Sequence, residues 1–572
     1  MVMQPNFFAE QRTRYDALQH SLRQTFDPFG LGETTQDAWQ AWLSHPNQLA
    51  LTLGDWLSDY TRWATFSAHR FVGAPDTDLF PAHPDDTRFA DPIWRDSPVW
   101  DSIKEWYLFN TRWLQTALYA TPGLDDEDCA RAAFWLRQYL NAVAPTNFFA
   151  LNPVAQARAL ATRGESLYFG LLNYARDVAS GDIAMTDMRA FKVGENLATT
   201  PGAVVYRNAL LEVIHYQPTT AEVHQKPIVL VSPWINKYYV LDLDSRKSLV
   251  KYLVDQGHSV FITSWKNPGP EARDVSFDDY VTDGVARIVE VAREISGSDS
   301  VNLAGYCIGG TLVAVYLAWL ARRGQAETVA SATLLTALTD FSWPGDIEVF
   351  LDEEGLSFVE NTIRRKGYLD GKEMAASFRM LRPNSLIWNY WVGNYLLGET
   401  PQPFDVLFWN MDTTRMPEKM HCYYLREFYF NNRLMRPDAL TIAGEPIDLG
   451  RIRTPMFMVS TEEDHIAPWK QTWKLTERAS GPITFTLSTS GHILGIINPP
   501  RPDSKRSYWQ GPVTRGMADE GWKAGQTRQS GSWWPSWVQW LAAHAGPKVA
   551  PRLASEQYPA LEPAPGRYVL EP

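Results

Sequence analysis

The sequence has very little cysteine: Cys129, Cys307 and Cys422 are the only three in 572 residues. Three widely spaced cysteines cannot build the disulfide framework of a small secreted domain, and this usage fits a reducing cytoplasm. The paired cysteine and histidine spacing that binds zinc is also missing. We therefore expect neither a disulfide scaffold nor a metal site nor a resident cofactor.

Blocks of basic residues are missing as well. The chain holds 53 Lys and Arg against 65 Asp and Glu, which gives a formal net charge of −12 and a pI of about 5.5. Proteins that bind nucleic acid neutralise its phosphates with clustered Lys and Arg, so this charge balance argues against a nucleic-acid partner.

Secretion and membrane insertion are not indicated by the sequence pattern. Residues 1–6 lack the basic and apolar segments of a signal peptide. The charge-free run at 301–321 is long enough for a transmembrane helix. However, three glycines and Asn302 near its start favour a buried strand, a turn and a helix. We expect a cytoplasmic protein without a transmembrane segment.

Tryptophan, in contrast, is abundant, with 24 residues. One interpretation is a core that is rich in tryptophan. The other is contact with an apolar partner, such as a second protein or a polymer surface.

The first part of the chain, residues 1–188, has the composition and apolar spacing of helices and shows no catalytic constellation. We expect a helical N-terminal domain that serves docking or oligomerisation. The expected helices cover residues 9–26, 35–70, 97–120, 125–144 and 151–179.

Residues 189–572 alternate between short apolar runs and helical patterns, which predicts an α/β fold with a mostly parallel sheet covered on both faces. The expected strands are 228–231, 260–263, 301–303, 332–336, 456–460 and 484–487, with clear helices at 278–295 and 311–321. The interval 337–455 is too long for a simple connection and is rich in aromatic residues. We expect a cap, about residues 337–430, over the carboxyl edge of the sheet.

After residue 499 the sequence is rich in loops. Four tryptophans, Trp533, Trp534, Trp537 and Trp540, fall in a predicted helix at 532–543. The proline-rich segment from residue 550 onward is expected to run over the surface.

The most informative motif is Gly305-Tyr306-Cys307-Ile308-Gly309, between a predicted strand and a predicted helix. Strand, Gly-x-nucleophile-x-Gly and helix form the nucleophile elbow of the α/β-hydrolase fold. The helix N-terminus would favour the Cys307 thiolate, and the Ile308 amide would donate to an oxyanion. The alternative is a small buried cysteine without chemistry.

In this fold the nucleophile is followed along the chain by an acid and then by a histidine. Asp464 follows the strand predicted at 456–460, and His492 follows the strand predicted at 484–487. The rivals are Glu462, Glu463 and His465. We favour His492 because a short glycine-containing loop after the last strand suits a base that must reach the elbow.

A second oxyanion donor is expected from the loop after the strand at 228–231. Pro233 has no N–H, so the amide of Trp234 or of Ile235 is the candidate. An ordinary turn at the end of a strand explains this loop equally well.

Several stretches closely resemble polyhydroxyalkanoate synthases, and the form of the elbow is most similar to the class I enzymes. The resemblance covers the chain from about residue 85 to its end. It rests on RFADPIW (88–94), PTNFFALNP (145–153), GENLATTPG (194–202), PWINKYYVLDL (233–243), GYCIGGTL (305–312), NYLLGETPQPFDVLFWN (394–410), EDHIAPW (463–469) and SGHILGIINPP (490–500).

The resemblance implies an acyltransferase that polymerises (R)-3-hydroxyacyl-CoA, with 3-hydroxybutyryl-CoA as the expected monomer, and that releases CoA. It implies Cys307 as the nucleophile, His492 as the base, and Asp464 as the partner of His492 or as a second base. Asn236, Asp242 and Trp409 also fall on family motif positions near the site.

One position departs from the family pattern. Many class I enzymes have a small residue two places after the catalytic histidine, and this chain has Leu494. The family is thought to use that position to influence monomer choice and polymer size. The resemblance further implies a homodimer and a protein attached to polyester granules and granule-associated proteins.

Two alternatives remain open. A cysteine-dependent thioesterase or hydrolase would share the triad and would pass the acyl group to water. A non-catalytic scaffold on the granule would keep the fold, although it would not need Cys307, Asp464 and His492 together.

Overall fold

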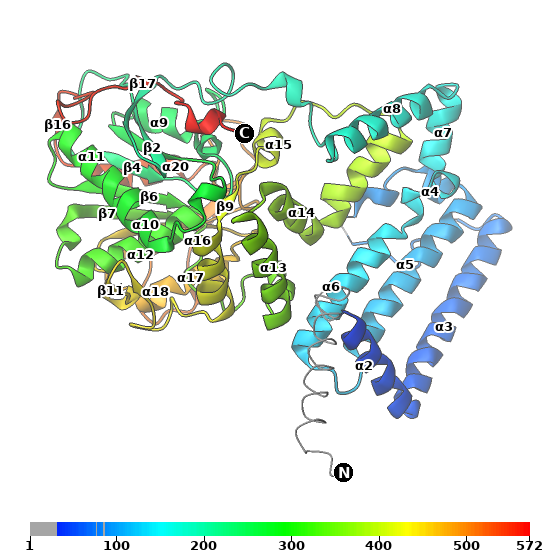
Figure 1. The fold of residues 1–572 in the computed structure, drawn as a ribbon. Helices are drawn as coiled ribbons and strands as arrows, with labels where there is room; N and C mark the ends of the chain where they lie inside the picture. The colour runs from blue at the N-terminus through cyan, green and yellow to red at the C-terminus, as the bar shows by residue number, and fades with distance from the viewer. Residues whose placement is uncertain (1–30, 76, 84–85) are drawn as a thin grey trace, which may run out of the picture. The chain divides into compact units, whose positions relative to one another are not determined.

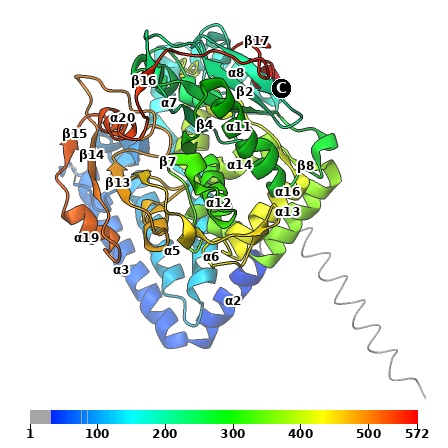
Figure 2. The same ribbon diagram turned by 90° about the vertical axis from the view of Figure 1, so that its left-hand side faces the viewer.

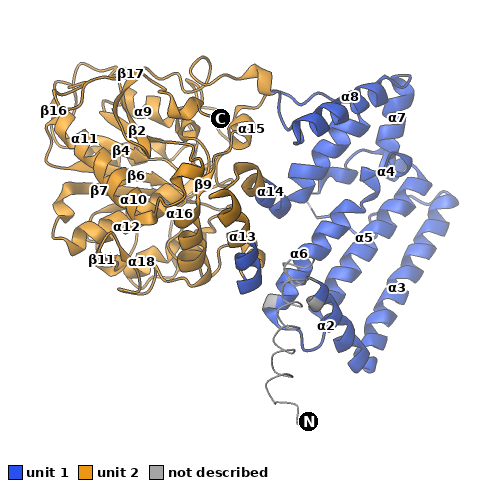
Figure 3. Ribbon diagram, in the orientation of Figure 1, with its two compact units in different colours: residues 1–187, 352–358, 376–402 blue, residues 188–351, 359–375, 403–572 orange. Residues whose placement is uncertain are grey.

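The computed structural model describes residues 31–75, 77–83 and 86–572, so the helix expected at 9–26 lies outside the described residues. The chain forms two compact units (Figure 3). Unit 1 comprises the described residues up to Asp187 together with Asp352–Phe358 and Ala376–Gln402. Unit 2 comprises Met188–Leu351, Val359–Ala375 and Pro403–Pro572. The first segment of unit 1 ends at Asp187, one residue before the predicted end of the helical N-terminal domain at residue 188.

Unit 1 is helical in its described part, as the sequence pattern predicted (Figure 1). Its α-helices up to Asp187 are α2 (Leu31–Ser44), α3 (Pro46–Phe71), α4 (Ile93–Asp96), α5 (Pro98–Tyr119), α6 (Asp126–Ala142), α7 (Pro153–Ala161) and α8 (Glu165–Ser180). Tryptophans join α3 to α5: Trp63 Nε1 donates to the carbonyl of Ser102 at 2.9 Å, and Trp113 Nε1 donates to the carbonyl of Thr52 at 2.9 Å. Part of the tryptophan content therefore serves helix packing.

The expected cap at 337–430 is divided between the two units, because part of it packs with the helices of unit 1. Tyr395 Oη donates to a carboxylate oxygen of Asp177 at 2.7 Å. Trp391 Nε1 donates to the carbonyl of Asn147 at 3.1 Å. The segment comprises the end of α14 (Gly371–Leu381) and two π-helical turns, Asn384–Trp388 and Trp391–Leu396. These partners lie more than 200 residues apart along the chain, so local sequence patterns could not assign this segment.

Unit 2 is built on one sheet of eleven strands in the order β15-β14-β13-β12-β7-β6-β4-β5-β2-β1-β17. The six predicted strands form its parallel centre: β4 (Ile228–Val231), β5 (Val260–Trp265), β6 (Val301–Tyr306), β7 (Val329–Leu335), β12 (Met456–Thr461) and β13 (Ile483–Ser488). The sheet continues on both sides in antiparallel strands that were not predicted. These are β1 (Gly202–Arg207), β2 (Leu211–Tyr216), β14 (Ser507–Pro512), β15 (Gln529–Ser530) and β17 (Glu562–Pro563). Figure 2 shows β13, β14 and β15 side by side at one edge.

Helices cover both faces of the sheet, as Figure 1 shows. Alternate residues of β4 enter different cores: Val229 and Val231 pack with α11 (Ala286–Ser296) and α12 (Ile308–Arg322), whereas Ile228 and Leu230 pack with α9 (Leu249–Asp255) and α20 (Trp534–Ala542). A strand that is apolar on both faces reads as a continuous apolar run. This explains why the sequence showed the centre of the sheet so clearly.

The end of the chain is more structured than the sequence suggested. β17 pairs with β1, and the side chains of Tyr568 and Val569 are buried, so the segment after residue 550 adds an edge strand and core contacts. Among the helices of the described ranges, none has the length and apolar character that crossing a membrane would require. The charge-free segment predicted as strand, turn and helix is β6, Cys307 and α12.

Candidate active site

Cys307 lies between the end of β6 and the start of α12, with φ 54° and ψ −126°. A positive φ is disfavoured for a residue with a side chain, so the surrounding structure must impose it. The thiol is partly exposed, unlike the fully buried residues of β6. This is the turn between strand and helix that the motif predicted, and the positive φ is an addition from the structure.

The glycines around Cys307 are required by close backbone contacts. A Cβ atom on Gly305 would lie 2.5 Å from the carbonyl oxygen of Gly309, and one on Gly310 would lie 2.5 Å from Cβ of Ala337. A Cβ atom on Gly309 would lie 2.4 Å from the carbonyl oxygen of Val231 in β4. The elbow can therefore turn sharply, and α12 can start directly beside β4, only with glycine at these positions.

His492 and Asp464 form the second part of the site. Nδ1 of His492 lies 2.7 Å from Oδ2 of Asp464, and both side chains are buried. The other carboxylate oxygen of Asp464 accepts the amides of Ile466 at 2.9 Å and Ala467 at 2.8 Å. The carboxylate is thus fixed by its own loop and aimed at the imidazole. The rival Glu462 instead forms an ion pair with Lys523 at 2.7 Å.

The charge state of His492 follows from this arrangement. Burial disfavours the imidazolium, but Asp464 and Cys307 outweigh burial and raise the pKa of His492 to about 10. An imidazolium beside a thiol stabilises the thiolate, which is the nucleophilic form of cysteine. The His492–Asp464 pair is therefore a suitable partner for the proposed nucleophile.

Two sets of amides are candidates for binding an oxyanion. Ile308 is the first residue of α12, and the first N–H groups of a helix have no partner within that helix. The loop after β4 lies close by, since a Cβ atom on Gly309 would lie 2.8 Å from the carbonyl oxygen of Ser232. Ile235 in this loop is half-buried, and its carbonyl accepts the amide of Thr414 at 3.4 Å. The amide roles remain predictions.

Asn236 and Trp409 connect the loop after β4 to the segment 405–414. Nε1 of Trp409, in α15 (Asp405–Met411), donates to the carbonyl of Lys237 at 2.6 Å. Nδ2 of Asn236 donates to the carbonyl of Asn410 at 3.3 Å, and Thr414 Oγ1 donates to the carbonyl of Trp234. These contacts orient the expected oxyanion loop. Nothing in the local pattern singled out Thr414.

The two remaining predicted site residues differ in their surroundings. Asp242 is buried, and one carboxylate oxygen accepts hydrogen bonds from Thr200 at 2.5 Å and Ser248 at 2.6 Å. Burial raises the pKa of Asp242. These bonds tie the segment before β1 to the start of α9. Leu494 is half-buried and packs against the same core as Cys307.

Two tyrosines near Cys307 were not predicted. Burial, with the charge of Cys307 as a further contribution, raises the pKa values of both Tyr424 and Tyr429. Their rings meet edge to face with centroids 5.3 Å apart, and Tyr429 packs in the same way on Phe341 at 4.7 Å. The aromatic run at 423–430 was the available signal. These rings form an aromatic wall whose tyrosines lie within electrostatic range of Cys307.

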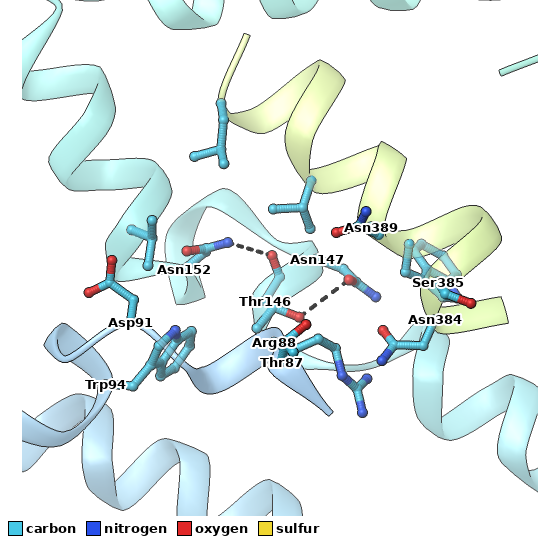
Figure 4. A pocket seen from close by; sticks show the side chains of 14 residues that line it. Thr87, Arg88, Asp91, Trp94, Thr146, Asn147, Asn152, Asn384, Ser385 and Asn389 are labelled. Carbon is cyan, nitrogen blue, oxygen red and sulfur yellow. Dashed lines mark hydrogen bonds between the residues drawn. The ribbon is translucent and has the colours of Figure 1, made fainter. Parts of the chain in front are cut away.

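A separate cavity of about 350 Å³ lies within unit 1 (Figure 4). The stretches 88–94 and 145–153, which carried the family resemblance, contribute to its wall. Several polar groups there hold the backbone: Asn152 Nδ2 donates to the carbonyl of Thr146 at 2.7 Å, and Asn152 Oδ1 accepts the amide of Ala155 at 3.1 Å. Arg88 is paired with Asp86 at 2.8 Å. We attribute the motifs of unit 1 to these structural bonds.

Two family models match the chain, and the first of them spans the change from unit 1 to unit 2 at residue 188. Residues 85–253 match the family described as "Poly-beta-hydroxybutyrate polymerase (PhaC) N-terminus". Residues 227–499, which contain the elbow, Asp464 and His492, match the alpha/beta hydrolase fold.

Relatives resemble most of the chain. The poly(3-hydroxyalkanoate) polymerase subunit PhaC of Cupriavidus necator is 44% identical over 491 residues, which is 85% of this chain and 83% of that protein. The poly(3-hydroxyalkanoate) polymerase of Methylorubrum extorquens is 39% identical, over 93% of this chain and 88% of that protein. The PhaC subunit of Rhizobium meliloti is 38% identical, over 94% of this chain and 88% of that protein.

Proposed function

This chain belongs to the poly(3-hydroxyalkanoate) polymerase family and is an acyltransferase, and we propose that Cys307 carries the growing acyl chain. The observation that supports this most directly is the strained Cys307 at the elbow beside a His492–Asp464 pair joined at 2.7 Å. The substrate that we propose is (R)-3-hydroxybutyryl-CoA.

The first step loads the enzyme. The Cys307 thiolate attacks the carbonyl carbon of the acyl-CoA, and the amides of Ile308 and of Ile235 or Trp234 stabilise the oxyanion. The C–S bond to CoA breaks, and CoA leaves as a thiolate that takes the proton held by His492. One thioester replaces another, so this step is nearly thermoneutral and reversible.

The second step joins two units. The 3-hydroxyl group of another hydroxyacyl unit loses its proton to neutral His492 and attacks the carbonyl carbon of the Cys307 thioester. An ester C–O bond forms, the C–S bond to Cys307 breaks, and the proton returns to the departing thiolate. Asp464 keeps the imidazole oriented in both steps, or acts itself as the base for the hydroxyl. Conversion of a thioester to an ester is downhill and drives growth.

Exclusion of water is the other requirement, because water competes with the hydroxyl group of the monomer. The wall formed by Tyr424, Tyr429 and Phe341 supports a site from which water is largely displaced. Leu494, which packs against the same core as Cys307, would narrow the space for the acyl side chain and favour short monomers. The same fold without this wall would admit water to the acyl-enzyme and would favour a thioesterase.

Unit 1 supplies a surface that suits attachment to polyester. Most of the exposed large hydrophobic side chains of the described residues belong to this unit. α8 alone exposes Leu167, Tyr168, Phe169, Leu171, Tyr174 and Val178. Exposed apolar patches of this kind mark interaction sites. We assign this surface to granule contact in the cytoplasm; the homodimer implied by the resemblance is a further proposal, which sedimentation of the active enzyme tests.

Incubation of the purified protein with 3-hydroxybutyryl-CoA tests the function. Free CoA and the acyl product are followed together, with Cys307→Ala as the control. Release of CoA with insoluble polyester, lost in Cys307→Ala, supports the proposal. Release of CoA with only free 3-hydroxybutyrate would identify a thioesterase, and absence of any release would favour a scaffold.

A further inference from the structure

The loop that carries His492 is held by its carbonyl groups. The carbonyl of Gly491 accepts the amide of Gly495 at 2.9 Å, and the carbonyl of His492 accepts Tyr306 Oη at 3.2 Å. The carbonyl of Ile497 accepts a guanidinium N–H of Arg506 at 3.3 Å. A loop that is bonded at so many carbonyl groups presents its histidine in one position.

Two of the bonds to this loop come from the tryptophan cluster at the start of α20. Nε1 of Trp533 donates to the carbonyl of Gly495 at 2.9 Å, and Nε1 of Trp534 donates to the carbonyl of Ile496 at 2.9 Å. Both indoles are fully buried, with exposed fractions of 0% and 1%. A buried carbonyl that loses its donor carries a desolvation penalty, so these bonds are not easily exchanged.

Gly495 also contacts the support of the acid. A Cβ atom on Gly495 would lie 2.3 Å from Cγ2 of Thr461, and Thr461 Oγ1 donates to Oδ2 of Asp464 at 3.2 Å. A displacement of Gly495 would therefore disturb both members of the His492–Asp464 pair. The indole of Trp533 therefore bonds to Gly495, the residue at which the loop of His492 contacts Thr461, the hydrogen-bond donor to Asp464.

We propose that Trp533 and Trp534 are positioning residues for His492, which they hold in line with Cys307 through their bonds to Gly495 and Ile496. This inference rests on the proposed roles of Cys307, Asp464 and His492. In this proposal the indole N–H groups of Trp533 and Trp534 contribute to the reaction, in addition to the contribution that their rings make to the core.

The chain offers matched controls. Trp473 and Trp522 are also fully buried, but their indole N–H groups have no hydrogen-bond partner within the described part of the chain. Replacement of Trp by Phe at these positions reduces the volume of the side chain, but no carbonyl group loses a hydrogen-bond donor. Trp537 provides a third case, because its indole bonds to Thr333 Oγ1 on β7 at 2.9 Å, away from the loop of the base.

The test compares Trp533→Phe and Trp534→Phe with Trp522→Phe and Trp537→Phe in the full-length enzyme. We measure kcat and KM for 3-hydroxybutyryl-CoA, the pH profile of Cys307 alkylation by iodoacetamide, and the melting temperature. The loop variants should lose about 10- to 100-fold in kcat and show an altered alkylation profile. The controls should lose only thermal stability.

An isosteric replacement separates position from bulk. 3-Benzothienylalanine at position 533 keeps the shape of the ring and removes the N–H, so it serves if Trp533→Phe does not fold. Equal kcat and equal alkylation profiles for loop variants and controls would overturn the inference. If Cys307→Ala, assayed in parallel, still made polymer, the proposed role of Cys307 as the nucleophile would fail, which is a distinguishable result.

Discussion

The hydroxyl group of Tyr306 donates a hydrogen bond to the carbonyl oxygen of His492 at 3.2 Å, and the two rings stack with centroids 5.5 Å apart. Tyr306 immediately precedes Cys307 and is fully buried. The elbow and the loop of the base are therefore joined directly, by the residue next to the nucleophile.

Tyr306→Phe keeps the stacked ring and removes this bond. We expect a loss of about 1 kcal/mol in the free energy of unfolding, the usual net value of a buried hydrogen bond, and a lower kcat. Urea unfolding and CoA release measure the two effects. A variant with unchanged stability and unchanged kcat would show that the bond does not hold the loop.

Asp464→Asn removes the charge that supports the imidazolium. We expect the pKa of His492 to fall from about 10 toward its ordinary value and acylation of Cys307 to slow by about 10²- to 10⁴-fold. Titration of ¹³C-labelled His492 and single-turnover release of CoA measure these changes. A pKa that stays near 10 would place the source of the shift elsewhere.

The same pair makes stability depend on pH. The pKa of folded His492 lies above its unfolded value, so the stabilisation is complete below about pH 6.5 and is lost as the pH rises through about 10. Unfolding midpoints of the natural protein should therefore exceed those of Asp464→Asn most at pH 6. The gap should narrow toward pH 10, and a gap that widens with pH would contradict this assignment.

His421 produces the opposite dependence. It lies in α16 (Glu418–Tyr423), is buried, and neither ring nitrogen has a hydrogen-bond partner among the described residues. Burial lowers its pKa to about 3, so the unfolded chain takes up the proton first when the pH falls below 6.5. Each pH unit below that value should destabilise the fold by up to about 1.4 kcal/mol through this residue.

His421→Leu tests this assignment. The variant should show a flatter decline of the unfolding midpoint between pH 6.5 and 4, because the titrating group is gone. Between pH 7 and 8 the two proteins should have parallel pH dependence. Identical slopes in the acid range would show that His421 does not contribute to acid sensitivity.

Gly309→Ala should damage the elbow. The added Cβ atom would lie 2.4 Å from the carbonyl oxygen of Val231 and 2.8 Å from that of Ser232, and both are backbone atoms that cannot move alone. We expect at least about a 100-fold loss of kcat, since the Ile308 amide would shift with α12. CoA release measures the loss.

Gly521→Ala is the matched control for this change. Gly521 lies in α19 (Asp519–Ala524), and a Cβ atom there would meet nothing within 4 Å. Alanine favours a helix over glycine by about 0.5–1 kcal/mol, so this variant should keep its activity and gain slight stability. Equal activity of both variants would remove the steric argument for Gly309.

The sequence was most informative where the structure of a segment is determined by its own residues. The apolar runs of β4 and β6 showed the buried centre of the sheet, and the elbow could be predicted from its glycine spacing between a predicted strand and a predicted helix. Antiparallel edge strands such as β2 lack that continuous signal in isolation and are recognised through their partners. Thr414, Tyr306 and the indole of Trp533 act through contacts made by distant segments, so no local pattern revealed them.

The division of the chain between the two units also determines when unit 1 can be completed during synthesis. Unit 1 includes Ala376–Gln402, so its last segment leaves the ribosome after the chain of β1 to β7 has already emerged. The helices that are synthesised first therefore lack their hydrogen bonds to Trp391 and Tyr395 until this later segment has been made. A fragment that ends at residue 187 lacks these side chains permanently. The N-terminal region is therefore not a module that gene fusion or truncation can move as a complete piece.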